Sequence, residues 1–244
     1  MAFQPVYELA TMRLLAFEAL ARWSHDSLGE ISPSEFVPIA ERLRLIEPIN
    51  DALLRKAMRA ACDWPDTIRL SVNLSAIQLC SPPSARKLIG KLAECGLSPA
   101  RLSVEVTETA LLIDFETVRA NLAALKAEGI RIILDDFGAG FASIAYLREI
   151  RFDTIKLDGS LIDSIVDSTA SRRLLEGVLR LCAALGTPCV AEHIESEEQL
   201  FLLRKLKCEN GQGFLLGSPL AAEEAARLAA TAASDQATEY SANR

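Results

Sequence analysis

The sequence has few of the residues that build zinc sites. Only two histidines are present, His25 and His193, and no C-x-x-C pair occurs among the six cysteines, which are Cys62, Cys80, Cys95, Cys182, Cys189 and Cys208. Zinc sites in proteins are made largely of clustered Cys and His ligands. The composition therefore argues against zinc chemistry.

Basic segments and long apolar segments are missing as well. The net charge is −7, and no run of Lys and Arg stands out, which argues against duplex nucleic acid as a partner. No apolar run reaches the about 18 residues of a membrane span, and no signal peptide is visible. Scattered cysteines in such a chain are typical of reduced thiols, so we expect a cytoplasmic protein without membrane contact.

Short apolar runs of β character alternate with amphipathic helical stretches. Half of the 244 residues are hydrophobic, and chains of about 250 residues commonly form one barrel domain. The predicted strands are 3–9, 14–23, 68–74, 102–106, 130–135, 154–157, 188–191 and 213–216. The predicted helices between them are 48–62, 85–95, 115–128, 171–185 and 197–206. Eight strands in this alternation predict an α/β fold, a TIM-like (β/α)8 barrel.

The two ends of the chain depart from a regular barrel. Only a few residues separate the first two predicted strands, too few for a crossover helix, so we expect an antiparallel hairpin and an irregular first strand. We expect the barrel domain to span residues 1–220. An Ala-rich helix over 221–233 should pack on or extend it, and residues 234–244 should be disordered.

The segment Asp135-Asp136-Phe137-Gly138 places two adjacent carboxylates at the end of an apolar strand. Two like charges beside a core are costly unless protons or cations neutralise them. A single Asp in this position is often a helix cap, and that interpretation stays open for Asp136. The doubled carboxylate instead favours a metal site.

Polar residues also stand at or near the ends of the other predicted strands: Glu18, Asn73, Glu105, Lys156, Glu192 and Gln212. In a barrel these ends converge on one face, where active sites lie. Carboxylate and amide oxygens suit Mg²⁺ or Mn²⁺, and paired carboxylates suit two-metal phosphodiester hydrolysis. Lys156 would orient a water or offset charge on a phosphoryl oxygen.

Each of these residues has a simpler explanation when taken alone. Glu18 would pair with Arg22, and Lys156 with Asp158, as ordinary ion pairs. A carboxylate-lined lyase or a glycosidase that uses two carboxylates is the broader alternative for the whole set. The Asn73 position and the doubled aspartate fit phosphodiester chemistry better.

The sequence segments around these residues resemble those of the EAL domain family of bacterial cyclic di-GMP phosphodiesterases. The resemblance extends from Gln4 to about Pro219. The matching segments are Gln4-Pro5-Val6, Phe17-Glu18-Ala19-Leu20-Ala21-Arg22-Trp23, Ser32-Pro33-Ser34-Glu35-Phe36, Val72-Asn73-Leu74-Ser75, Glu105-Val106-Thr107-Glu108-Thr109, Asp135-Asp136-Phe137-Gly138, Lys156-Leu157-Asp158, Ala191-Glu192-His193-Ile194-Glu195 and Gln212-Gly213. Both their order and their spacing agree with the family.

The resemblance implies a role for each matching position. The implied ligands of a first metal ion are Glu18, Asn73, Glu105 and Asp135, and those of a second are Asp135, Asp136 and Glu192. The implied catalytic residues are Lys156, Glu192 and Asp136, with Lys156 on the nucleophilic water. The implied substrate-binding residues are Gln4, Leu20, Arg22 and Gln212. The implied supporting residues are Glu108, which would anchor the loop after Asp136, and Glu195.

The implied activity is hydrolysis of one phosphodiester bond of cyclic di-GMP to linear 5'-pGpG, with two Mg²⁺ or Mn²⁺ ions. A homodimer and an upstream sensory or GGDEF domain in a longer parent chain are also implied. The loop residues Ala139, Phe141 and Ala142 replace the family's hydroxyl-bearing side chains, and His193 replaces a glycine. These departures keep open the alternative of a catalytically weak or silent cyclic di-GMP receptor.

Overall fold

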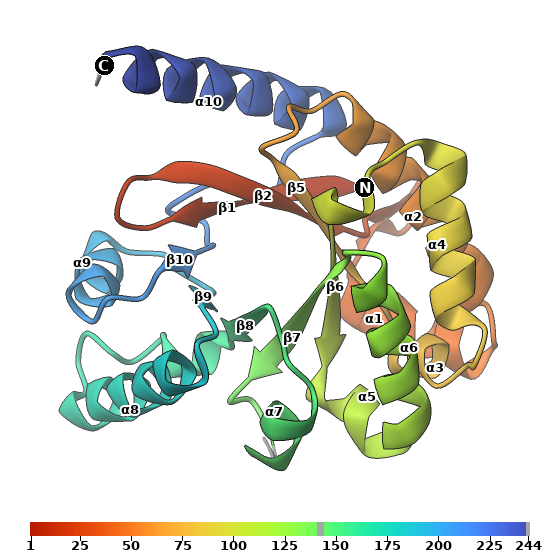
Figure 1. Cartoon of the computed structure of the whole chain (residues 1–244), viewed down its shortest axis with the longest axis horizontal. Coiled ribbons are helices and arrows are strands. Elements are labelled where there is room, and N and C mark those ends of the chain that lie inside the picture. The colour runs from red at the N-terminus through yellow and green to blue at the C-terminus, as the bar shows by residue number, and fades with distance from the viewer. Residues whose placement is uncertain (141–143, 243–244) are drawn as a thin grey trace.

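The computed structural model describes residues 1–140 and 144–242, and eight of its strands close into a barrel (Figure 1). These strands are β1 (Ala2–Glu8), β2 (Arg13–Leu20), β5 (Arg69–Asn73), β6 (Leu102–Thr107), β7 (Arg131–Phe137), β8 (Thr154–Leu157), β9 (Cys189–Ala191) and β10 (Asn210–Gly211). Their order around the barrel is β1-β10-β9-β8-β7-β6-β5-β2. The predicted TIM-like fold is confirmed.

The first strand is the irregular one, as the short connection predicted. β1 pairs antiparallel with both β2 and β10, whereas the other neighbouring pairs of the barrel are parallel. The register of β1 on β2 shifts between Val6 and Tyr7. An antiparallel strand needs only a tight turn to its neighbour, so no helix covers this step.

Two predicted strand boundaries are wrong. The last strand is β10, before Gln212, and not 213–216, which forms a turn in which Gly213 accepts a hydrogen bond from the backbone of Leu216. The apolar run was misleading because Leu215 and Leu216 pack on the core without pairing in the sheet. β2 ends at Leu20, and the residues after it form a separate hairpin of β3 (Trp23–His25) with β4 (Gly29–Ile31).

Helices cover the outside of the barrel. Five were predicted within a few residues: α2 (Ile46–Cys62), α4 (Ser84–Cys95), α6 (Phe115–Ala127), α8 (Thr169–Leu185) and α9 (Glu197–Lys205). Shorter ones were not predicted: α1 (Pro33–Arg42), α3 (Ala76–Leu79), α5 (Glu108–Ile113), α7 (Ile144–Glu149) and the 3-10 turns η1 (Pro99–Arg101) and η2 (Gly159–Leu161). Ser75 and Ser196 begin α3 and α9 with capping boxes, which satisfy free backbone amides.

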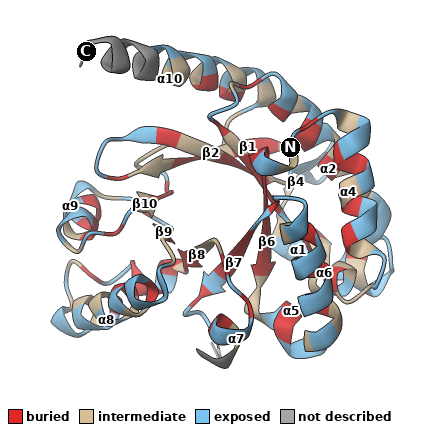
Figure 2. Cartoon of the chain, in the orientation of Figure 1, coloured by how far each residue is buried: buried red, intermediate tan, exposed pale blue. Residues whose placement is uncertain are grey.

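The core lies between the strands and the helices (Figure 2). Along β5, Leu70 and Val72 are buried against this layer, while Arg69, Ser71 and Asn73 alternate with them. The same alternation in each strand turns polar side chains into the barrel. The interior is therefore available for a charged site without interrupting the apolar core.

The C-terminal helix α10 (Ala222–Ala242) packs against β1, β2 and α2. It is preceded by Leu220, whose backbone exchanges hydrogen bonds with that of Phe3. The helix continues to Ala242, past the boundary expected at 233, because Ala-rich sequence without Gly or Pro favours helix. Among the described residues, no helix combines the length and apolar character needed to cross a membrane.

Candidate metal centre

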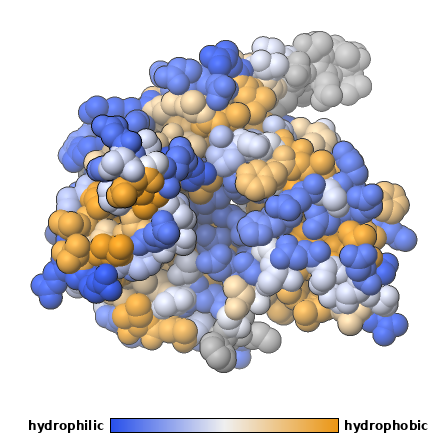
Figure 3. Space-filling model, turned by 180° about the vertical axis from the view of Figure 1, so that it is seen from behind, coloured by the Kyte–Doolittle hydropathy of each residue, from blue (hydrophilic) through white to orange (hydrophobic). Residues whose placement is uncertain are grey.

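The strand ends bring the predicted polar residues into one cluster at the C-terminal mouth of the barrel. Glu18, Glu105, Asp135 and Lys156 lie on β2, β6, β7 and β8, Asn73 ends β5, and Glu192 and Gln212 directly follow β9 and β10. From the opposite side to Figure 1, hydrophilic side chains surround a central hollow (Figure 3). The barrel therefore encloses polar chemistry that its strands hold rigidly.

The ammonium of Lys156 is the centre of this cluster. Its Nζ lies 3.0 Å from Glu18, 2.9 Å from Glu105, 3.2 Å from Asp135 and 2.8 Å from Glu192. Lys156 is only 3 % exposed. One buried cation thus holds four carboxylates from four different strands within reach of one another.

Side-chain amides and a hydroxyl complete the hydrogen bonding of two of these carboxylates. Asn73 Nδ2 donates to Glu18 Oε1 at 2.8 Å, and Gln212 Nε2 donates to Glu18 Oε2 at 2.9 Å. Gln212 Nε2 also donates to Gln4 Oε1 at 3.0 Å. Ser71 Oγ donates to Glu105 Oε1 at 2.5 Å.

Ser71 was missed by the sequence reasoning. It lies two residues before Asn73 on β5, and strand periodicity places both side chains on the same face. That spacing was the available signal.

The carboxylates of the cluster are not equivalent electrostatically. Burial raises the pKa of Glu105 well above its usual range, and the nearby charge of Glu18 adds to the effect. Burial also raises the pKa of Glu192 to about 7, although Lys156 opposes the shift. The pKa of Glu18 is lowered, because Lys156 and the amides of Gln212 and Asn73 outweigh the effect of burial.

Lys156 itself remains charged. Burial alone would lower its pKa, but Glu105, Glu18, Asp135 and Glu192 raise it well above the usual range. In this arrangement its ammonium is a buried cation that contacts four carboxylates.

The adjacent aspartates lie in the last three residues of β7. Asp135 is buried, whereas Asp136 is exposed and adopts a left-handed backbone with φ 55°. Oxygen atoms of Asp135, Asp136 and Glu192 lie within 4.8 Å of one another. Burial and the charge of Asp135 both raise the pKa of Asp136.

These residues fit a divalent cation. The donor set consists of hard carboxylate and amide oxygens, and Gln212 Oε1 is a buried acceptor without a partner in the described part of the chain. Glu18, Glu105, Asp135, Asp136 and Glu192 carry five formal negative charges against the one positive charge of Lys156. Such an excess is stabilised by protons or by metal cations.

Other predicted residues lie around this cluster. Leu20 and Asn73 line a cavity of about 520 Å³ between α1, α2 and the ends of β2 and β5. Arg22 is exposed, and its guanidinium donates to the backbone oxygen of Ala21 at 2.8 Å, so it does not pair with Glu18. Glu195 is exposed beyond Glu192 and takes no part in the cluster's hydrogen bonds among the described residues.

The loop after Asp136 begins beside Glu108. A Cβ on Gly140 would lie 3.9 Å from Glu108 Oε2, and Glu108 Oε1 is buried without a partner among the described residues. Burial raises the pKa of Glu108, and the backbone of Gly138 partly offsets this. The substituted residues Phe141 and Ala142 lie outside the described residues.

His193 packs against the turn after β8. Its φ is 54°, and a Cβ on Gly159 would meet its Nδ1 at 2.1 Å. His193 therefore has a non-glycine left-handed backbone, and Gly159 leaves room for its ring.

The family model described as EAL domain matches residues 1–219. The chain is 42% identical over 217 residues to an uncharacterised signalling protein of Caulobacter vibrioides, with 89% of this chain and 27% of that protein covered. It is 34% identical over 227 residues to a cyclic di-GMP phosphodiesterase of Pseudomonas aeruginosa, with 92% of this chain and 39% of that protein covered. The chain thus spans well under half of these curated relatives.

Solved structures agree in fold. PaMucR phosphodiesterase, solved as a c-di-GMP complex, has a TM-score of 0.86 at 32% identity and covers 91% of this chain and 92% of its own. A manganese and cyclic di-GMP complex of Klebsiella pneumoniae BlrP1 has a TM-score of 0.79 at 31% identity, with 90% and 55% covered.

Proposed function

Because the chain belongs to the EAL domain family, we propose that it hydrolyses one phosphodiester bond of cyclic di-GMP to linear 5'-pGpG in a reaction that depends on divalent metal ions. The observation that carries this proposal is the complete donor set around Lys156. Each carboxylate and amide named as a ligand from the sequence lies at the same mouth of the barrel, and among the described residues none forms an ion pair outside the cluster.

The charge balance supports two ions. Five carboxylates against one ammonium leave a formal charge of −4, which two divalent cations would offset. Glu18, Asn73, Glu105 and Asp135 would hold one Mg²⁺ or Mn²⁺, and Asp135, Asp136 and Glu192 would hold the other. Bound ions of this kind polarise a phosphoryl oxygen and lower the pKa of a bound water.

The chain's own groups would orient the reactants. Lys156 is a permanently charged donor that can position a water and stabilise negative charge on phosphorus-bound oxygens. Glu192, with its pKa raised to about 7 by burial, is suited to accept a proton near neutral pH. Arg22 and Gln4 at the rim would bind phosphate and the sugar-phosphate ring, with Leu20 and Gln212 completing the substrate surface.

The direct test is turnover of cyclic di-GMP by the purified chain with Mg²⁺ or Mn²⁺, and with EDTA. We expect 5'-pGpG in the metal samples alone. Asp135→Asn and Glu18→Gln should lose at least about two orders of magnitude in rate, in line with the loss of groups that stabilise developing charge. The matched control is Glu128→Gln, an exposed carboxyl at the end of α6, which should keep full rate.

A silent receptor is the second candidate, favoured by the altered loop residues Ala139, Phe141 and Ala142 and by Glu108 Oε1, which is buried without a partner among the described residues. Calorimetry with cyclic di-GMP separates the two functions. Tight binding with no linear product by a folded, metal-loaded protein would establish the receptor and reject the enzyme. If Asp135→Asn keeps both the binding and the rate of the unaltered chain, the ligand assignment itself is rejected.

We further propose that the domain acts as a homodimer within a longer cytoplasmic signalling protein that carries an upstream sensory or GGDEF domain. The greater length of the relatives supports the extra domains. Light scattering on the purified chain measures the dimer, and a monomer at all concentrations would reject it for this domain alone.

A further inference from the structure

Three parallel strands of the barrel begin at an arginine, at the mouth opposite the carboxylate cluster. Arg13 starts β2, Arg69 starts β5 and Arg131 starts β7. Since these strands run parallel in the order β2-β5-β6-β7, the three side chains gather at the same end. The other end of the same strands carries Glu18, Asn73 and Asp135.

A small cavity lies between Arg69 and Arg131 inside this mouth. Its volume is about 50 Å³, and the other polar residues that line it are Ser71, Ser103, Glu105, Thr154, Lys156 and Asn210. One ordered water needs about 15 Å³, so the cavity has room for roughly three groups of that size. Hydroxyl and amide donors together with two guanidinium groups are the lining that binds an oxyanion.

Neither Arg69 nor Arg131 has a hydrogen-bond or ion-pair partner within the part of the chain that the structure describes. Burial lowers the pKa of the half-buried Arg69, and the positive charges of Arg131 and Arg13 lower it further. Two uncompensated cations in a chain of net charge −7 are unusual, because like charges near a core repel at a cost.

The acidic groups near this mouth already have partners. Glu105, at the inner end of the cavity, pairs with Lys156 at 2.9 Å. Asp153 pairs with Lys126 at 2.8 Å and accepts from the backbone of Ile132.

Two further carboxylates near this mouth are likewise engaged. Glu209 accepts from the backbone of Cys189 at 3.1 Å. Glu8 accepts from Thr11 and Arg13. These four carboxylates are therefore engaged with other partners, and an anion from outside the chain would supply a counter-charge to Arg69 and Arg131.

We propose that the N-terminal mouth of the barrel is a binding site for a small oxyanion of the phosphate class, held between the guanidinium groups of Arg69 and Arg131. Arginine's planar fork suits two parallel hydrogen bonds to phosphate oxygens. The bound anion would relieve the repulsion between the two cations and join β5 to β7 across β6. The cavity borders the carboxylate cluster at Glu105 and Lys156, but Arg69 and Arg131 take no part in that cluster, and the proposal does not depend on the function proposed for it.

The probe is inorganic phosphate, titrated into the full chain in EDTA at constant ionic strength adjusted with NaCl. Calorimetry gives the affinity, and thermal unfolding gives the stabilisation. We expect phosphate to raise the melting temperature above that in equal ionic strength of NaCl. Arg69→Gln and Arg131→Gln should each weaken phosphate binding about tenfold or more, the effect of losing a charge-assisted hydrogen bond.

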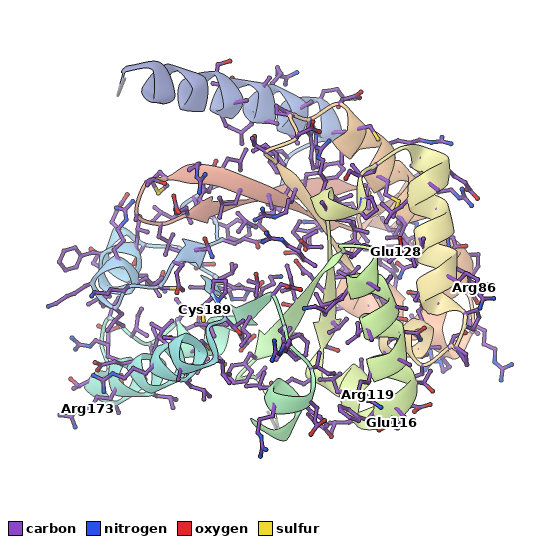
Figure 4. All side chains as sticks on the ribbon, in the orientation of Figure 1. Arg86, Glu116, Arg119, Glu128, Arg173 and Cys189 are labelled. Atoms are coloured by element: carbon purple, nitrogen blue, oxygen red, sulfur yellow. The ribbon has the colours of Figure 1, made fainter. Side chains whose placement is uncertain are left out.

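Two control variants locate the effect. Arg86 projects outward from α4, away from the barrel (Figure 4), and Arg86→Gln should bind phosphate as the unaltered chain does. Arg22→Gln, at the opposite mouth, removes the arginine proposed to contact substrate phosphate there, and it should keep the phosphate binding that depends on Arg69 and Arg131. If Arg22→Gln abolishes binding while the Arg69 and Arg131 variants retain it, the anion belongs to the catalytic mouth and the proposal is overturned.

The stability of the variants without phosphate supplies an independent readout. Arg131 is exposed and has no partner to lose, so Arg131→Gln should fold and, in chloride alone, be at least as stable as the unaltered chain. With phosphate, the unaltered chain should be more stable than Arg131→Gln. Binding of GMP as tight as that of phosphate would identify a phosphomonoester ligand, and weaker binding would identify the free ion. No stabilisation by either compound beyond that of NaCl would overturn the proposal.

Discussion

Replacement of Lys156 by methionine should destabilise the metal-free protein strongly. The side chain is 4 % exposed, and its ammonium lies within 3.2 Å of four carboxylate oxygens. Methionine fills a similar volume but supplies no charge. Glu18, Glu105, Asp135 and Glu192 would then face one another at the barrel mouth with no cation between them.

The size of the effect follows from the burial of this network. Removing one partner of a buried ion pair costs about 3–5 kcal/mol, because the charges left behind are uncompensated. For a domain of this length, each kcal/mol lowers the melting temperature by about 2–4 °C, so we expect a fall of roughly 6–20 °C at pH 8. Lys87→Met is the control: Lys87 is exposed and pairs with Glu47, and such surface pairs contribute about 0–1 kcal/mol.

The loss of stability caused by Lys156→Met should become smaller as the pH falls. Burial raises the pKa of Glu192 to about 7, so the stability given by its protonated form is complete below the usual glutamate range and is lost as the pH rises through about 7. Glu105, whose pKa is also raised by burial, responds in the same direction. The pKa of Lys156 is raised, so its ammonium persists throughout this range. Removal of Lys156 raises the pKa of both carboxyls further, because the lysine opposes the shift in each, so protons compensate for the missing ammonium more fully at pH 5.5 than at pH 8.

Urea unfolding in EDTA at pH 8 and pH 5.5 measures both effects. A loss below about 1 kcal/mol at pH 8, the size of a surface ion pair, would refute the view that Lys156 holds the carboxylates together. An equal loss at the two pH values would refute the assignment of the raised pKa values to Glu105 and Glu192.

Two further predictions concern metal binding and the last barrel strand. Mn²⁺ should raise the melting temperature more at pH 8 than at pH 5.5, because the ion competes with protons on Glu105 and Glu192. Calorimetric scans with Mn²⁺ and with EDTA measure this difference. An equal shift in melting temperature at both pH values would contradict the prediction. Gly213→Ala should destabilise by about 3 kcal/mol or more, the upper range for overpacking, since its Cβ would meet backbone atoms of Ile194 at 2.2 Å. The control for Gly213→Ala is Gly90→Ala, on α4 with open space around it, which should be neutral or stabilising. Urea unfolding measures both variants. Similar stability of the two would contradict the turn after β10.

Much of the barrel could be predicted from local patterns. The strand β7 was recognised because a β-branched run ends at Asp135, and the antiparallel β1 because few residues separate it from β2. The prediction failed at 213–216, where an apolar run packs on the core as a turn. Periodicity reports that residues are buried, and it does not report whether their backbone pairs with a neighbouring strand.

The simple ion pairs considered from the sequence were wrong for a related reason. Arg22 donates to a backbone oxygen and not to Glu18. Asp158 accepts from the backbone of Ser160 at the start of η2 and does not pair with Lys156. Nearness along the chain favoured those pairs, whereas burial and strand direction favoured partners from distant strands.

The sequence by itself determined which residues stand at the strand ends, because strand alternation and strand length are local properties. It thereby determined the family, the kind of barrel and the chemical type of the carboxylate cluster. Only the tertiary structure decided that Lys156 lies among carboxylates from β2, β6 and β7 and from the end of β9. It also decided that Arg69 and Arg131 line one cavity at the other mouth, with no ion-pair partner among the described residues. Both arrangements depend on closure of the barrel, which brings together strands that are far apart in the chain.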